Sequence, residues 1–298
     1  LPAYRSFRLS RIIKPDAVHK LPSTKTLWRE TWSFLWQYRI KMLQFVAIYT
    51  VTYLVLVKGI SSFSLDTAEL KTELQEVFSG NSGAILTFLT LYASLMSSLA
   101  SSSSELTNYF QLTVTIIFSL AFIWLVRKLH LRNAKVSVKD SFYQGMRPLI
   151  QFLTVGLMIV LQLIPLVIGG ALYISIQSSA LAVTDWEQIS ITVLAILGLV
   201  LSTYLIAGSV FAIYIVTLPD TTPMVALRSS MRLLRIHRWM VMRRMFAFFI
   251  GLLVLGFVLV FPFIMWLPTF AEYAFFVMAC ASFAVLHTFM YKLYRSML

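Results

Sequence analysis

Residues 245–267 read MFAFFIGLLVLGFVLVFPFIMWL, and this stretch decides the fold class of the chain. No charged side chain occurs between Met245 and Ala271. A helix of about 20 mostly apolar residues is long enough to cross the ~30 Å hydrocarbon core of a bilayer. The stretch therefore predicts a helix that spans a membrane.

The rest of the chain has the same character. Of its 298 residues, 59% are apolar and 12% are charged, and the mean hydropathy is +0.80. Soluble domains are about 45–50% apolar and about 25% charged, so the composition excludes a soluble enzyme. The apolar windows predict an all-α membrane bundle of six spans, at 42–60, 106–126, 149–175, 189–217, 246–267 and 273–291.

Lys and Arg residues decide which way these spans run. Nine lie in residues 1–41, six in 127–147, six in 217–244 and two from Lys292 onward, whereas Lys58 and Lys71 lie on the opposite side. Basic loops stay in the cytoplasm. We therefore expect both termini to be cytoplasmic, and we attribute the net charge of +13 to membrane topology rather than to binding of nucleic acid.

A further window, residues 84–100, is free of charge but is not counted as a span. If it crossed the membrane, every later basic loop would move to the outside, against the positive-inside rule. We expect it to be a re-entrant or surface-lying segment within a small external subdomain, residues 61–105. Because no apolar run opens the chain, we also expect no cleavable signal peptide.

The first basic stretch ends in an expected amphipathic helix rich in tryptophan. Trp28, Trp32, Leu35 and Trp36 recur at helical spacing, with basic residues elsewhere around the helix. Tryptophan is favoured at the level of the lipid headgroups, where its ring is in apolar surroundings and its N–H stays hydrated. We expect the three tryptophans to anchor this helix to the lipid interface.

The other two basic stretches contain recognisable helix starts. Ser137-x-x-Asp140 predicts a capping box, and Thr222 followed by Pro223 predicts an N-cap and a first helical residue. A basic face is attracted to anionic lipid, so the third helix should also lie at the interface. Its expected apolar stripe is Met224, Leu227, Met231 and Leu234, and its expected basic face is Arg228, Arg232 and Arg235.

The order "amphipathic helix, span, outer loop, span back" occurs three times. It divides the chain into a basic cytoplasmic segment with its helix (1–41), a first hairpin (42–126), a second helix and hairpin (127–217) and a third helix and hairpin (218–298). Parallel repeats in some transporters are related by an axis along the membrane normal. A threefold structural repeat is one interpretation, and the alternative is that positive-inside topology alone produces the pattern.

Four stretches together are distinctive: KLPST from Lys20, DSFYQGMRPLI from Asp140, QLIPLVIGG from Gln162 and YIVTLPDTTPM from Tyr214. With them, most of the chain resembles a family of uncharacterised polytopic membrane proteins from bacteria of the candidate phyla radiation. Its architecture is more distantly similar to the membrane domain attached to some glycerophosphodiester phosphodiesterases. The resemblance implies the bacterial cytoplasmic membrane, and it implies no activity or catalytic residues.

Few polar residues occur in the middle of the expected spans. Gln162, Tyr204 and His287 are candidates to line a cavity, and Pro165 is a candidate kink that contacts a substrate. Each has a plainer alternative. His287 lies near the cytoplasmic end of its span, where a structural hydrogen bond is an alternative role, and proline is common in ordinary spans.

No pattern typical of catalysis accompanies these residues. The histidines lack metal-ligand spacing, Cys280 is the single cysteine, no P-loop occurs, and no carboxylate lies inside an expected span. Ser209 follows Gly208 without the pattern expected of a rhomboid-type serine protease. We therefore predict a protein with no enzymatic activity, no metal and no cofactor.

These observations favour a membrane scaffold or a subunit of a larger complex. Its expected partners are membrane lipids, including anionic headgroups, and a protein bound at the cytoplasmic amphipathic helices. The alternative is a permease-like transporter of a neutral or amphiphilic solute or lipid, and a membrane enzyme is a third class. A central polar cavity would favour the permease.

The sidedness predicts a labelling result. Cysteine introduced as Lys139→Cys or Arg228→Cys should react with a membrane-impermeant maleimide only after the cells are permeabilised, because both positions lie in basic loops. Labelling of either position in intact cells would contradict the predicted orientation.

Overall fold

The structure is a computed structural model that describes residues 22–58, 72, 75–76, 87, 105–131, 136–179, 185–219, 221–235 and 237–298. These residues form helices and no strand. Five of the helices are long and apolar enough to cross a membrane, or six if the pair Val138–Gly145 and Leu149–Leu161, bent by 74°, counts as a single span. The all-α, multi-pass membrane class is therefore confirmed. The expected external subdomain, including residues 84–100, falls almost entirely outside the described residues.

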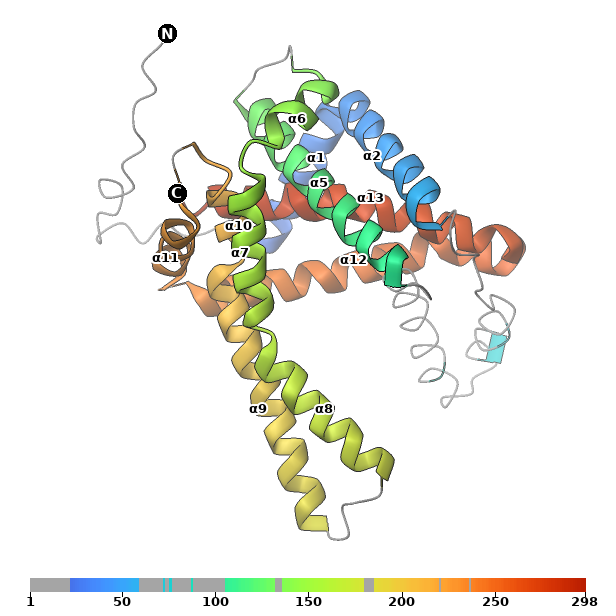
Figure 1. Ribbon diagram of the computed structural model, residues 1–298. Helices are drawn as coiled ribbons and strands as arrows, with labels where there is room; N and C mark the ends of the chain where they lie inside the picture. The colour runs from blue at the N-terminus through green and yellow to red at the C-terminus, as the bar shows by residue number, and fades with distance from the viewer. Residues whose placement is uncertain are drawn as a thin grey trace.

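The described helices follow one another in the order shown in Figure 1. They are α1 (Thr24–Gln37), α2 (Arg39–Tyr53) with a π-helical turn η2 (Leu54–Lys58), α5 (Glu105–His130), α6 (Val138–Gly145), α7 (Leu149–Leu161), α8 (Ile164–Ser179), α9 (Asp185–Ser209), α10 (Ala212–Ile215), α11 (Pro223–Leu234), α12 (Arg238–Trp266) and α13 (Pro268–Arg295).

The three short amphipathic helices begin where capping residues stand. The Ser23 hydroxyl accepts a hydrogen bond from the Thr26 N–H at 3.2 Å, and Ser137 and Asp140 form a reciprocal capping box. Thr222 caps α11, and Pro223 occupies its first turn. The starts predicted at Ser137 and Thr222 are confirmed, because capping depends on residues close in sequence.

The buried face of α1 differs from the predicted tryptophan stripe. Trp32 and Trp36 are 55% and 65% exposed, but Trp28 packs into the protein, with its ring 5.1 Å from that of Phe248. Periodicity identifies apolar side chains without telling whether lipid or protein covers them, so the prediction that all three tryptophans face lipid was wrong for Trp28. The residues buried on α1 are Leu27, Thr31 and Phe34.

The stripe expected on α11 is likewise divided between two faces. Leu227 and Leu234 are buried as expected, whereas Met224 and Met231 are 48% and 41% exposed. Small residues complete the buried face instead, since close helix packing favours them. The residues buried on α11 are Ala226, Leu227, Ser230 and Leu234.

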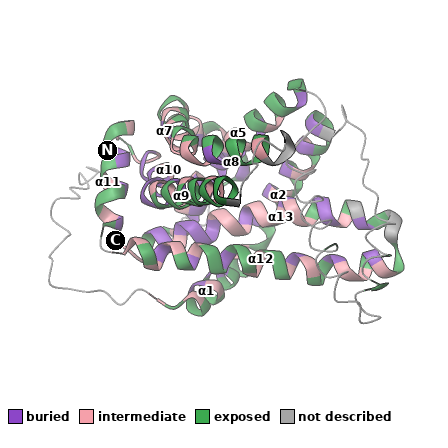
Figure 2. Ribbon diagram, turned by 90° about the horizontal axis from the view of Figure 1, so that it is seen from below, coloured by how far each residue is buried: buried purple, intermediate pink, exposed green. Residues whose placement is uncertain are grey.

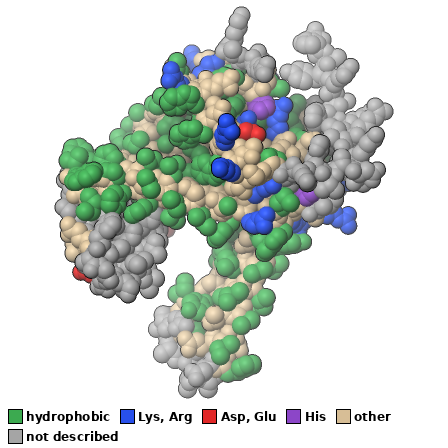
Figure 3. All heavy atoms as spheres, turned by 180° about the vertical axis from the view of Figure 1, so that it is seen from behind, with side chains coloured by type: hydrophobic (Ala, Val, Ile, Leu, Met, Phe, Trp, Pro, Cys, Tyr) green, Lys and Arg blue, Asp and Glu red, His purple; other side chains and the backbone are tan. Residues whose placement is uncertain are grey.

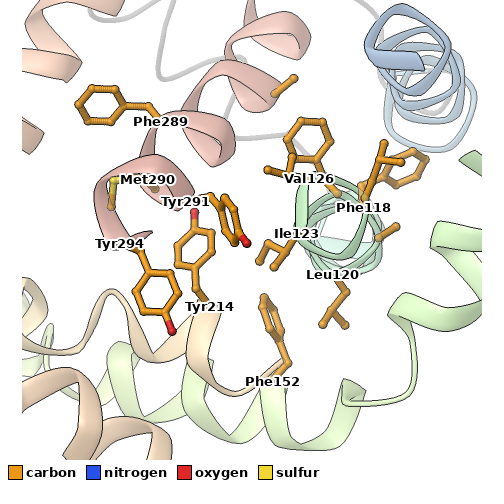
Figure 4. Close-up of a cluster of buried hydrophobic side chains, with 14 of the residues drawn as sticks. Phe118, Leu120, Ile123, Val126, Phe152, Tyr214, Phe289, Met290, Tyr291 and Tyr294 are labelled. Atoms are coloured by element: carbon orange, nitrogen blue, oxygen red, sulfur yellow. The ribbon is translucent and has the colours of Figure 1, made fainter. Parts of the chain in front are cut away.

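The core gathers around α13, which packs against α1, α2, α5 and α12. Figure 2 shows that buried residues concentrate on this helix and its neighbours. In Figure 4, Tyr291 and Tyr294 of α13 approach Tyr214 of α10, while Ile123 of α5 and Phe152 of α7 close the cluster. The last described helix therefore packs against four others at the centre of this core.

The α8–α9 hairpin projects from this body and runs crosswise to α12 and α13 (Figures 1 and 2). Its apolar surface is largely uncovered, and only 6% of the most apolar window of Trp186–Ile215 is buried. The span expected over 149–175 is two helices, α7 and α8, separated at Gln162 and Leu163. The described helices thus form a body with a projecting hairpin, whereas we had predicted one bundle of spans.

Glycine allows the two helices of the hairpin to approach closely. A Cβ atom on Gly198 would lie 2.5 Å from the carbonyl oxygen of Pro165, and one on Gly169 would lie 3.1 Å from the Cα of Ala195. A Cβ atom on Gly170 would meet nothing within 4 Å. The close contact between the two helices therefore depends on Gly198 and Gly169 and not on Gly170.

This difference predicts opposite effects of two alanine substitutions. Gly198→Ala should lower the free energy of unfolding by about 1–3 kcal/mol, because the methyl group overpacks the helix contact. Gly170→Ala should leave it unchanged or raise it, because alanine is the better helix former. Thermal unfolding of the purified protein in detergent measures both, and equal midpoints for the two variants would contradict the close contact.

Candidate functional site

The polar residues proposed to line a cavity do not meet at one place. Gln162, Tyr204 and His287 each contact a different set of neighbours in the described part of the chain, and Pro165 is packed against the backbone of Gly198. A substrate path lined by these side chains would require all of them to face one shared space, whereas each packs against different neighbours. The contacts of each residue explain its position.

Gln162 joins the two places where the hairpin leaves the body. It lies at the break between α7 and α8, and its Oε1 atom accepts a hydrogen bond from the hydroxyl of Ser209, the last residue of α9. Four residues further on, the Leu166 N–H donates to the hydroxyl of Ser202 at 3.0 Å. In hydrocarbon each backbone group needs a partner within the protein, and Ser202 supplies one at this break.

Pro165 does not mark the kink itself. The break lies at Gln162 and Leu163, and Pro165 is the second residue of α8, where a proline fits the first turn of a helix. Its carbonyl oxygen is directed at Gly198 of α9. Pro165 therefore begins a helix and contacts another helix.

His287 links three helices within the core. Its Nε2 atom lies 3.2 Å from the hydroxyl of Ser119 on α5, and its Nδ1 atom lies 3.1 Å from the hydroxyl of Tyr214 on α10. The rings of Phe122 and Phe283 pack around the imidazole, with centroids 6.0 and 4.6 Å away. Both ring nitrogens thus have hydrogen-bonding partners, which agrees with a structural hydrogen bond.

Arg127, near the C-terminal end of α5, fixes the same region. Its guanidinium donates to the carbonyl oxygens of Thr217 and Tyr214, at 2.6 and 3.0 Å, and to the hydroxyl of Thr217. A cation at the end of a helix interacts favourably with the last carbonyl groups. Sequence reasoning missed Arg127, Ser119 and Tyr214 as contact residues, because their partners are distant along the chain.

Tyr204 lies on the outside of α9 instead of facing a cavity. Its side chain is 53% exposed, and the guanidinium carbon of Arg238 lies 4.5 Å from the centre of its ring. Arg238 is the first residue of α12. This pair therefore lies where the hairpin meets the body.

The residues predicted to anchor the protein to lipid are exposed, with Trp28 as the exception. Trp32 and Trp36 lie on α1, and the guanidinium carbon of Arg39 is 5.4 Å from the ring centre of Trp36. In Figure 3, Lys and Arg side chains occur on the body, whereas the visible part of the projecting hairpin carries hydrophobic ones. The exposed basic residues of α11 are Arg228, Arg232 and Arg235.

Within the described ranges, no three His, Cys, Asp or Glu side chains come together to hold a metal ion. A shallow pocket of about 250 Å³ lies between α1 and the end of α13, and its lining mixes the charges of Arg29, Glu30 and Lys292. The Lys292 ammonium lies 5.2 Å from the ring centre of Phe34 at this pocket. The residues that line this pocket do not have the donor set or geometry of a catalytic centre.

Comparison with protein-family models, with curated proteins and with solved structures found no match.

The contacts of His287 predict a loss of stability when one partner is removed. Tyr214→Phe should lower the free energy of unfolding by about 1–2 kcal/mol, because the imidazole then loses a buried hydrogen bond. Tyr109→Phe, on a side chain that is 67% exposed on α5, is the matched control and should have no effect. If both variants unfold at the midpoint of the parent protein, the hydrogen bond does not stabilise the core.

Proposed function

We propose that this chain is a non-catalytic, multi-pass component of the bacterial cytoplasmic membrane that acts as a scaffold or as a subunit of a larger complex. One observation carries the proposal: the polar side chains expected to line a path are engaged within the protein. Gln162 accepts from Ser209, and His287 contacts both Ser119 and Tyr214. Such bonds fix helices to one another.

The permease alternative depends on polar groups that face a shared space. Tyr204 is exposed and contacts Arg238, while His287 is packed between the aromatic rings of Phe122 and Phe283. A substrate site at mid-membrane would need such groups to converge. The engaged residues therefore favour the scaffold over the permease.

The short helices α1, α6 and α11 are proposed to lie at the inner lipid interface. Each presents an exposed apolar or aromatic side chain near an exposed basic one: Trp32 near Arg29, Tyr143 near Lys139, and Met231 near Arg232. An amphipathic helix of this kind lies in the plane of the interface and is attracted to anionic headgroups. Both termini would then be cytoplasmic, as the distribution of Lys and Arg indicates.

The packing of these helices supports a threefold repeat. α6 packs against α5 and α2, α11 against α9, α10 and α7, and α1 against α13 and α12, so each short helix covers both long helices of one hairpin. In each, the fourth and eighth residues after the N-cap are buried. These pairs are Leu27 and Thr31 after Ser23, Ser141 and Gly145 after Ser137, and Ala226 and Ser230 after Thr222.

Six crossings are part of the proposal, with α7 and α8 together making one of them. The break at Gln162 and the end of α9 at Ser209 are joined by a hydrogen bond, so the two helices of the hairpin meet the body at neighbouring points. The length and apolar surface of α9 support a crossing.

Two measurements on the same protein test the proposed function. In proteoliposomes, release of entrapped glycerol and flip-flop of a fluorescent phospholipid should occur at the rates of protein-free vesicles. In native membranes solubilised with a mild detergent, the tagged protein should migrate well above its mass of 34.0 kDa. Transport above the background rate would establish the permease and contradict the scaffold.

A pair of variants tests whether a partner protein docks on α6, one of the three short amphipathic helices. Tyr143→Glu alters the most exposed aromatic side chain of α6, which is 79% exposed, and should return the protein to the mass of the monomer. Ile174→Ala, at a position of α8 that is 66% exposed, is the control and should keep the larger mass. A complex that survives Tyr143→Glu would exclude α6 as its docking face, and migration of the parent protein as a monomer would contradict the scaffold.

A further inference from the structure

Arg238 is held in an unusual position where the hairpin meets the body. Its guanidinium carbon lies over the ring of Tyr204, 4.5 Å from the ring centre, which is within the range of a cation–π contact. A Cβ atom on the buried Gly208 would lie only 3.3 Å from the same group. The guanidinium thus occupies a space on α9 that the ring of Tyr204 borders and that a side chain at position 208 would fill.

The sequence around Arg238 supplies no counter-ion for its guanidinium. Residues 221–271 contain six arginines and neither Asp nor Glu. In the described part of the chain, the Nε atom of Arg238 is buried without a hydrogen-bond partner. The protein covers the Nε atom, so an anion would bind at the remaining nitrogens of this half-buried guanidinium, where an acceptor with a negative charge lowers the free energy of the uncompensated cation.

An apolar stripe leads away from the guanidinium along α9. Leu197, Leu201 and Tyr204 share one face of the helix by their spacing, and each is at least 49% exposed. The same face continues to Val193, about 17 Å from Tyr204 at 1.5 Å per residue. This length compares with the ~15 Å of one leaflet of hydrocarbon. A cation is therefore joined to an uncovered apolar surface long enough for an acyl chain.

From these features we infer that the junction of α9 and α12 binds an anionic phospholipid. The phosphate is held by the guanidinium of Arg238, whose planar donors match phosphate oxygens, and one acyl chain lies along the stripe of α9. A second copy of this chain fits the junction less well, because its corresponding surface carries the same uncompensated positive charge. The inference rests on the membrane location proposed above and is independent of the scaffold role.

Native mass spectrometry of the full chain in nanodiscs tests this site. The nanodiscs contain equal amounts of phosphatidylglycerol and phosphatidylcholine, and the retained lipids are counted after mild activation. The parent protein should retain one phosphatidylglycerol in preference to phosphatidylcholine by about tenfold or more, since a charge-assisted guanidinium–phosphate pair is a strong interaction. Arg238→Gln should abolish the preference.

Three further arms keep the test decisive. Arg243→Gln changes an exposed arginine on another face of α12 and should keep the preference. Arg238→Lys retains the charge but not the planar donors, so it should retain the lipid more weakly than the parent even if Arg238→Gln fails to fold. Inorganic phosphate at millimolar concentration should not displace the lipid, because it has no acyl chain to bind the stripe.

Each possible result either supports or overturns the lipid site. Equal retention of the two lipids by the parent protein, or equal retention of phosphatidylglycerol by Arg238→Gln and the parent, would overturn the site. Displacement by inorganic phosphate would assign the guanidinium to a free anion and would also overturn the lipid. None of these results depends on transport or on the size of a complex, so the scaffold proposal is judged separately.

Discussion

Hydrocarbon offers no hydrogen bonds, and this constraint governs where polar side chains stand in this molecule. Two polar side chains within the apolar helices are paired across helix boundaries: Gln162 with Ser209, and His287 with Ser119 and Tyr214. Each pair fixes the position of two or three elements. The same constraint explains the serine at the break of α7 and α8, because Ser202 satisfies a backbone N–H there.

Sequence alone predicted the features that depend on neighbouring residues. The capping box at Ser137 and the start of α11 at Thr222 followed from residues within three positions of each other. The apolar windows likewise predicted α12 and α13 closely, because crossing a bilayer requires a long uncharged segment. These signals are local, so no tertiary contact was needed to interpret them.

The remainder depends on which surface covers an apolar or polar side chain. Trp28 and Trp32 have the same chemistry and lie one turn apart, yet one packs on Phe248 and the other is exposed. Hydropathy does not distinguish these surroundings, because lipid is as apolar as a protein core. The candidate cavity failed for a related reason: Gln162, Tyr204 and His287 were grouped by polarity, whereas their partners come from helices distant in sequence.

The contact between α1 and α13 joins the first and last described helices. A ribosome delivers α1 to the membrane long before the surface that covers Leu27 and Phe34 has been synthesised. Until α13 has been synthesised, this helix must therefore rest on lipid or on an insertion chaperone. Completion of the core therefore waits for α13, so a chain truncated before α13 exposes α1 to membrane proteases.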